Sequence, residues 1–102
     1  MSNEIKTITP EEVQQLLNNG KKVSLIDVRE DEEVEEGMIP EAKHIRLGTI
    51  PERMNEINKD EEHIMVCRSG RRSESACEYL KEHGYEVKNM VGGMMKWEGN
   101  VK

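Results

Sequence analysis

Short apolar runs alternate with helix signals along this chain, and this alternation limits the fold more than any other feature. Each run is too short for a helix, and turn residues or segments with helical spacing separate it from the next run. Strands separated by helices imply a parallel sheet that is covered by helices on both faces. We therefore predict one α/β domain over residues 1–102, with a sheet of about five strands. These strands are expected at residues 5–8, 23–28, 44–47, 64–66 and 87–90.

Several helix boundaries can be read from the residue types. Thr9 and Pro10 predict a helix start, because threonine caps a helix well and proline suits the first helical position. Glu12 follows at the spacing that closes a capping box with Thr9, and Gly20 is expected to end this helix. Further helices are predicted at residues 50–57, from Ser73 to His83, and in a short segment after Gly93.

The charge balance limits the classes of partner. With a net charge of −6, the surface as a whole is unsuited to nucleic acid. Residues 30–36 are almost all acidic, and we expect a solvated short helix or loop there rather than an interaction site. No apolar stretch approaches the ~20 residues that span a bilayer, and the first residues lack a secretory signal pattern. We therefore expect a cytoplasmic monomer with no nucleic-acid or membrane partner.

The cysteine and histidine content limits disulfide and metal chemistry. Two cysteines are too few for a disulfide framework, and with three scattered histidines they do not predict a zinc site. We expect no metal and no cofactor. Cys77 is either a resolving cysteine for Cys67 or, as we favour, a small apolar filler that faces the sheet from a helix.

The segment from Cys67 to Ser73 follows a predicted buried strand and opens a helix, which is where open α/β sheets bind ligands. Backbone N–H groups at a helix start, together with three arginines, stabilise negative charge. We therefore expect the pKa of Cys67 to lie below the ~8.5 of a free cysteine, which makes this residue the candidate nucleophile. The alternative is a buried structural cysteine. The loop residues that would surround the sulfur are Arg68, Ser69, Gly70, Arg71, Arg72 and Ser73.

This loop resembles the active-site loop of rhodanese domains, in which Cys is followed by Arg-Ser-Gly, a variable residue, Arg and Ser. Other segments are similar to the same family and stand in the right order. Met38 and Glu41 replace the usual His and Gly, which we expect to change the rim of the site rather than its chemistry. The resemblance implies a rhodanese-like fold. The similar segments are Asp27–Glu30, Gly37–Ala42, Gly84–Val87 and Asn89–Gly93, followed by Trp97.

The resemblance also implies a sulfurtransferase. By analogy, Cys67 would take a sulfane sulfur from thiosulfate or a persulfide donor and hold it as a persulfide. A small thiol, cyanide or an acceptor protein would then remove the sulfur. Arg68 and Arg71 would attract the small anionic donor at the mouth of the site. Asp27 and Arg29 would support the site, with Asp27 as the expected ion-pair partner of Arg72.

Two other function classes remain open at this point. Cell-cycle phosphatases and arsenate reductases that share the fold use a similar cysteine loop, with one residue more than the four between Cys67 and Arg72. The shorter loop should form a smaller pocket, which favours a single sulfur atom over a tetrahedral oxyanion. A non-catalytic rhodanese-like binding module is the other alternative. Such modules often lack the cysteine that this chain has.

Overall fold

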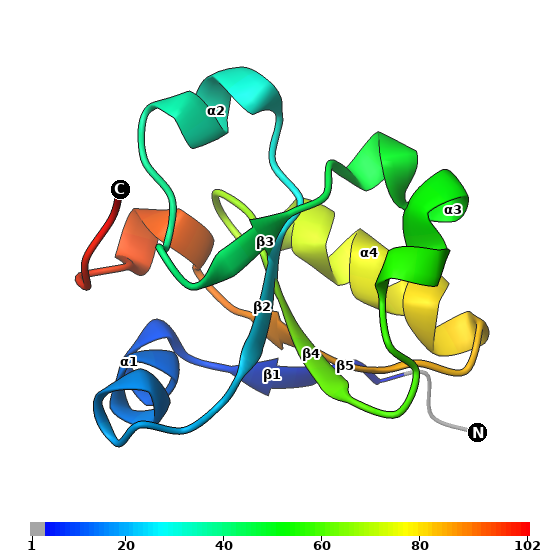
Figure 1. The fold of residues 1–102 in the computed structure, drawn as a ribbon, viewed down its shortest axis with the longest axis horizontal. Coiled ribbons are helices and arrows are strands. Elements are labelled where there is room, and N and C mark those ends of the chain that lie inside the picture. The colour runs from blue at the N-terminus through cyan, green and yellow to red at the C-terminus, as the bar shows by residue number, and fades with distance from the viewer. Residues whose placement is uncertain (1–3) are drawn as a thin grey trace.

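A parallel sheet lies at the centre of the computed structural model, which describes residues 4–102 (Figure 1). Its five strands lie in the order β1-β5-β4-β2-β3, and every neighbouring pair is parallel. This arrangement confirms the predicted α/β class with a sheet of five strands. The strands are β1 (Lys6–Ile8), β2 (Ser24–Asp27), β3 (Ala42–His44), β4 (Glu62–Val66) and β5 (Glu86–Met90).

Helices cover both faces of this sheet, and the core is accordingly divided into two hydrophobic clusters. The first contains Ile50, Ala76 and Leu80 from the α3 and α4 side, and the second contains Val13 from α1. Each fully buried Val, Leu or Ile side chain contributes roughly 1.5–3 kcal/mol. The helices are α1 (Pro10–Asn18), α2 (Asp31–Glu35), α3 (Ile50–Arg53) and α4 (Arg71–Glu82), with 3-10 turns η1 (Leu47–Thr49), η2 (Met54–Glu56) and η3 (Gly93–Lys96).

Strand β4 shows how the sequence divides its side chains between the two clusters. Ile64 and Val66 pack in the cluster beside α1, whereas Met65 and the following Cys67 pack in the cluster beside α4. This is the alternation that a strand imposes on successive side chains. Because both faces of β4 are covered by apolar groups near its carboxyl end, its last three residues, Ile64 to Val66, are all apolar, as expected for a central parallel strand.

The start of α1 has the predicted capping box. The backbone N–H of Glu12 donates to Thr9 Oγ1 at 3.1 Å, and the backbone N–H of Thr9 donates to Glu12 Oε1 at 3.0 Å. These two bonds satisfy N–H groups that have no partner within the helix. No helix within residues 4–102 is long and apolar enough to cross a membrane.

Several predicted elements differ from the observed ones, among them the final short helix, which is the 3-10 turn η3. The strand expected at residues 44–47 is instead β3 at Ala42–His44, because its partner β2 ends at Asp27, which pairs with His44. The helix expected at residues 50–57 is the short α3 between two 3-10 turns, since so short a segment gains little cooperativity as a continuous α-helix. Helix α4 begins at Arg71 rather than Ser73, because Gly70 adopts a φ of +102° and forms the N-cap.

Candidate functional site

The loop from Cys67 to Gly70 joins the end of β4 to the start of α4 at the carboxyl edge of the sheet. The positive φ of Gly70 turns the chain sharply into the helix, and a Cβ there would lie 3.2 Å from the backbone nitrogen of Gly92. Glycine is therefore favoured both by the conformation and by the close neighbour. The earlier helix start also places Arg71 and Arg72 in the first turn of α4.

The Cys67 sulfur lies inside this turn and is 0% exposed. The backbone N–H of Gly70 donates to Cys67 Sγ at 3.0 Å, and Ser73 Oγ lies 3.2 Å from the same sulfur. Burial alone raises the pKa of the Cys67 thiol. The Ser73 hydroxyl and the backbone N–H groups of Ser73, Gly70 and Ser69 outweigh that effect, so the pKa lies below its ordinary value. The loop thus stabilises the thiolate mainly with hydrogen-bond donors.

A buried asparagine connects the two ends of this loop. The Ser73 hydroxyl donates to Asn89 Oδ1, and Asn89 Nδ2 donates to the carbonyl oxygen of Gly70 at 3.0 Å. Asn89 belongs to β5 and is only 3% exposed. Our reading of the sequence assigned it no role in the site. The available signal was its spacing of two residues from Val87, which places a polar residue on the face of the strand that is expected to be apolar.

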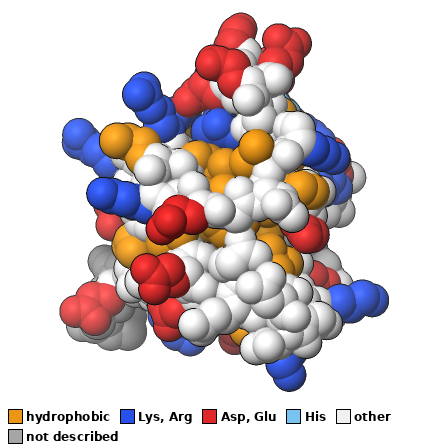
Figure 2. Space-filling model, turned by 90° about the vertical axis from the view of Figure 1, so that its left-hand side faces the viewer, with side chains coloured by type: hydrophobic (Ala, Val, Ile, Leu, Met, Phe, Trp, Pro, Cys, Tyr) orange, Lys and Arg blue, Asp and Glu red, His pale blue; other side chains and the backbone are white. Residues whose placement is uncertain are grey.

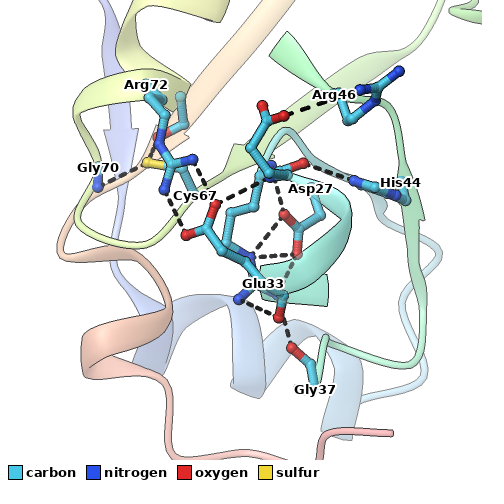
Figure 3. A network of polar contacts seen from close by, with 11 residues as sticks. Asp27, Glu33, Gly37, His44, Arg46, Cys67, Gly70 and Arg72 are labelled. Carbon is cyan, nitrogen blue, oxygen red and sulfur yellow. Dashed lines mark hydrogen bonds and ion pairs between the residues drawn. The ribbon is translucent and has the colours of Figure 1, made fainter. Parts of the chain in front are cut away.

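Arg72 forms its ion pair with Glu33 of α2, not with Asp27 as predicted. Arg72 Nη1 and Nη2 donate to Glu33 Oε1 and Oε2 at 2.7 and 2.8 Å. This bidentate contact with Arg72 lowers the pKa of Glu33 to about 2. The pair therefore fastens the first turn of α4 to α2, as Figure 3 shows.

Asp27 is occupied by Arg29, which explains why it does not reach Arg72. Arg29 Nη2 donates to Asp27 Oδ2 at 2.8 Å, and Arg29 Nε donates to Asp27 Oδ1 at 3.0 Å. The same guanidinium donates to the carbonyl oxygens of Gly37 and Glu33, at 2.8 and 3.4 Å. Both side chains are buried, so the pair holds the middle of α2 and the residue Gly37 that follows it at the carboxyl end of β2 (Figure 3).

The acidic run at residues 30–36 is therefore not uniformly solvated, so the prediction of a solvated segment is wrong for Glu33. Glu33 is 28% exposed at its side chain and is committed to Arg72. Glu32, Glu35 and Glu36 are exposed. The sequence pattern could not separate these roles, because the inward position of Glu33 depends on how α2 packs against the cysteine loop.

A cavity of about 440 Å³ lies beside the loop. Arg68 lines one part of it, and Met94, Met95 and Val101 supply apolar surface. Figure 2, which views the molecule from the left-hand side of Figure 1, shows apolar side chains across the middle of this face and acidic ones at its top. Arg71 is exposed on α4. The cavity thus combines an apolar wall with two arginines, Arg29 and Arg68, and two carboxylates, Glu33 and Glu36.

The C-terminal residues form part of the cavity rim. Lys102 N–H donates to the carbonyl oxygen of Met38 at 2.9 Å, and Met38 N–H donates to the carbonyl oxygen of Lys102 at 3.3 Å. Val101 lies against Gly37 and lines the cavity. The chain end is therefore paired to the segment that follows α2.

Cys77 lies in the middle of α4 within the first hydrophobic cluster and is 0% exposed. Burial, with smaller contributions from Glu74, Glu78 and Cys67, raises its pKa to about 12. Both cysteines are free thiols. This environment fits the small apolar filler that we favoured. Among residues 4–102, no group of three or more His, Cys, Asp or Glu side chains is arranged to hold a metal ion.

Comparison with known proteins gives a consistent result. The family model described as "Rhodanese-like domain" matches residues 9–100. The chain is 52% identical to YtwF of Bacillus subtilis over 99 residues, covering 97% of this chain and 96% of the relative. It is 34% identical to the thiosulfate sulfurtransferase GlpE of Pseudomonas syringae, covering 92% and 88%. The crystal structure of a rhodanese-like domain protein from Staphylococcus aureus superimposes with a TM-score of 0.92 at 40% identity, covering 96% and 97%.

Proposed function

Since this chain belongs to the rhodanese-like domain family, we propose that it transfers sulfur through a persulfide on Cys67. The name of its relative GlpE supports sulfur transfer as the general activity and thiosulfate as a donor. The observation that carries the proposal is the position of Cys67 Sγ, 3.0 Å from the Gly70 nitrogen at the start of α4. A thiolate is the nucleophilic form of cysteine, and the loop stabilises that form.

In the first step, the Cys67 thiolate attacks the outer sulfur of thiosulfate. A bond forms between Sγ and that sulfur as the sulfur–sulfur bond of the donor breaks, and sulfite leaves with the electron pair. Cys67 then carries an anionic persulfide. With an organic persulfide as donor, the same bonds form and break and a thiolate leaves instead. The backbone N–H groups that lower the pKa of the thiol would also stabilise the persulfide anion.

In the second step, a nucleophilic acceptor removes the outer sulfur. Cyanide, a small thiolate or a thiolate of an acceptor protein bonds to that sulfur, and the bond from Cys67 Sγ breaks. The electron pair returns to Sγ and regenerates the thiolate. Division of one transfer into two displacements of this kind is the usual advantage of covalent catalysis.

Arg68 is our candidate for attracting an anionic donor, since it lines the cavity beside the loop. Arg71 would act more weakly from the exposed surface of α4. Arg72 and Arg29 have structural roles in this proposal, because their guanidinium groups are already bound to Glu33 and Asp27. Since Cys67 is 0% exposed, the residues around it must separate locally before the donor reaches the sulfur.

The alternative functions are less well supported by the same residues. The four residues between Cys67 and Arg72 are one fewer than the phosphatase-type loop contains, and Arg72 is paired with Glu33 rather than free to bind a phosphate group. A binding module would not need donors directed at a cysteine sulfur. Sulfur transfer fits both the short loop and the hydrogen-bond donor directed at the Cys67 sulfur.

The test is the intact mass of the protein before and after incubation with thiosulfate. Wild type and Cys77→Ala should both gain the mass of one sulfur atom, whereas Cys67→Ala should gain none and should lose sulfur transfer to cyanide. Cys77→Ala is the matched control, because it also removes a buried thiol from the same cluster. Loading of Cys67→Ala, or a persulfide mapped to Cys77, would overturn the proposal. So would the absence of loading by either thiosulfate or an organic persulfide under conditions that load an authentic rhodanese.

A further inference from the structure

Asn89 is a polar residue at a position where packing alone would favour an apolar one. It lies within β5, between strands β1 and β4, where it pairs with Thr7 and Met65. Val87 belongs to the same face of β5 and packs in the hydrophobic cluster beside α4. Burial of an amide costs free energy unless its polar atoms are hydrogen-bonded. The presence of Asn89 therefore calls for an explanation beyond the stability of the sheet.

The hydrogen bonds of Asn89 have a fixed direction. Asn89 Nδ2 donates to the Gly70 carbonyl at 3.0 Å, so the amide presents Oδ1 toward Ser73 as an acceptor. Ser73 Oγ also lies 3.2 Å from Cys67 Sγ. A hydroxyl group has one proton to donate. Asn89 Oδ1 and a Cys67 thiolate would therefore compete for the same proton of Ser73.

We infer that Asn89 is a positioning residue that directs the Ser73 hydroxyl proton away from Cys67, and so favours the thiol and persulfide forms of Cys67 over the free thiolate. The thiolate part of this inference needs only the hydrogen bonds described above. The persulfide part rests on the function proposed for Cys67.

Each state of the sulfur has its own hydrogen-bond arrangement. In the thiol, Cys67 donates to Ser73 Oγ, Ser73 donates to Asn89 Oδ1 and Asn89 donates to the Gly70 carbonyl, so every donor is used. In the thiolate, Ser73 turns its proton to Sγ, and buried Asn89 Oδ1 loses its donor. In the persulfide, Sγ is bonded to the outer sulfur and the charge lies mainly on that outer atom. The Ser73 proton then returns to Asn89 Oδ1, which restores the hydrogen bonds from Ser73 to Asn89 and from Asn89 to the Gly70 carbonyl.

This competition gives Asn89 two opposing effects on Cys67 that experiment can separate. Through Gly70, Asn89 holds the loop in place, and loss of that contact would raise the pKa of Cys67. Through Ser73, it withdraws a donor from the thiolate, and loss of that contact would lower the pKa. We expect the second effect to dominate, because Gly70 remains held by its own φ and by its place at the helix start. A purely structural role for Asn89 predicts the opposite sign.

The experiment measures the rate of iodoacetamide alkylation of sulfur-free protein against pH, with Cys77→Ala as the common background. The midpoint of each rate profile reports the pKa of Cys67. Each rate is divided by the plateau rate of the same variant, which corrects for differences in the access of iodoacetamide to the sulfur. Asn89→Leu should shift the midpoint to lower pH and increase the normalised rate below the midpoint about three- to tenfold, as expected for one hydrogen bond. Ser73→Ala should shift the midpoint to higher pH. The double variant should have a midpoint equal to or above that of Ser73→Ala, because without the Ser73 hydroxyl only the effect of Asn89 through Gly70 remains.

Controls distinguish this role from general disruption of the loop. Ser73→Thr keeps a hydroxyl and should retain the wild-type midpoint. Ser75→Ala removes an exposed serine that donates to the Arg71 carbonyl on the same helix, and it should change nothing. An upward shift of the midpoint in Asn89→Leu, or additive effects in the double variant, would overturn the inference.

Two further measurements test the inference if Asn89→Leu does not fold. Asn89→Ala should shift the midpoint in the same direction. In the wild type, the side-chain amide signals of Asn89 in an NMR titration should change with the same midpoint as alkylation, and signals that do not change would overturn the inference. Because no sulfur donor is present, these results do not depend on whether Cys67 carries sulfur.

If Cys67 does load, the loading equilibrium constant in thiosulfate–sulfite mixtures should fall about three- to tenfold in Asn89→Leu. An unchanged constant would overturn the persulfide part alone.

Discussion

Cys67 and Cys77 carry the same side chain in the same hydrophobic cluster, and both are fully buried. Burial raises the pKa of each thiol. For Cys67, the Ser73 hydroxyl and three backbone N–H groups reverse this effect, whereas for Cys77 the charges of Glu74 and Glu78 add to it. The two residues thus differ in the groups around the sulfur rather than in depth.

The position of each cysteine relative to α4 explains this difference. Cys67 lies just before the helix, where the first N–H groups have no partner in the preceding turn and can donate to a sulfur. Cys77 lies in the middle of the helix, where the N–H groups are already bonded to carbonyls of the previous turn. The helix start therefore creates a site for an anion, and the helix interior does not.

The largest expected effect is a difference in alkylation between the two thiols. At neutral pH, iodoacetamide should label Cys67 at least ~100-fold faster than Cys77, because a thiol with a pKa of about 12 is almost entirely protonated. The midpoint of the alkylation rate at Cys67 should lie below that of a free cysteine, which is about pH 8.5. Peptide mapping by mass spectrometry after brief labelling gives both rates. In denaturant, where the surroundings are lost, the two rates should converge. Equal rates in the folded protein would contradict the comparison.

The next largest effect is expected from Gly93→Ala, which should displace the Cys67 loop and weaken the hydrogen bonds to the Cys67 sulfur. A methyl group at Gly93 would overlap the backbone carbonyls of Cys67 and Arg68, which accept hydrogen bonds from Met94 and Met95. Displacement of the loop should raise the alkylation midpoint of Cys67. The free energy of unfolding should fall by ~1–3 kcal/mol for the overlap, in addition to about 1–2 kcal/mol for the left-handed φ.

Gly20→Ala is the matched control for that variant. Gly20 has a φ of +72°, but no atom lies within 4 Å of the added methyl group. Its urea unfolding curve should therefore show the conformational cost alone, with the Cys67 midpoint unchanged. If both alanine variants shift that midpoint equally, contact with the loop is not what distinguishes Cys67.

The smallest effect is expected from Glu33→Gln. This variant tests whether the charge of Arg72 contributes to the difference in pKa between Cys67 and Cys77. Because contact with Arg72 depresses the pKa of Glu33 to about 2 from 4.5, its stabilisation is present above pH 4.5 and is lost as the pH falls toward 2. The partly exposed pair should contribute no more than ~1 kcal/mol. The variant should therefore be slightly less stable at pH 7, with a smaller further loss in acid, as unfolding curves at both pH values would show.

Glu56→Gln provides the comparison for that measurement. Arg53 and Lys43 depress the pKa of Glu56 to about 2 as well, so acid stability should change in both variants. Alkylation of Cys67 should respond, by about threefold or less, only when Glu33 is changed, since the freed charge of Arg72 lies near the loop. A larger response would mean that arginine charge, rather than hydrogen-bond donors, separates the two cysteines.

The sequence allowed prediction of those features that depend on neighbours along the chain. The apolar runs predicted the strands, Thr9 and Glu12 predicted the cap of α1, and Cys67 through Ser73 predicted the anion-stabilising turn. Contacts between segments that are far apart in the sequence could not be predicted in this way. Arg72 and Glu33 are 39 positions apart, and their pairing depends on the packing of α2. Asn89 approaches Gly70 and Ser73 only because β5 lies beside β4 in the sheet.

The pairing of Lys102 with Met38 also determines where anything joined to this chain would begin. Because that pairing lies at the rim of the cavity beside Arg68, a thiol-bearing peptide attached after Lys102 through a short flexible linker would start next to the cysteine loop. The tether would present the acceptor to the sulfur at an effective concentration on the order of millimolar. Transfer within one molecule would then exceed transfer from dilute free peptide without any new contact, which makes this chain end a suitable point for fusing an acceptor.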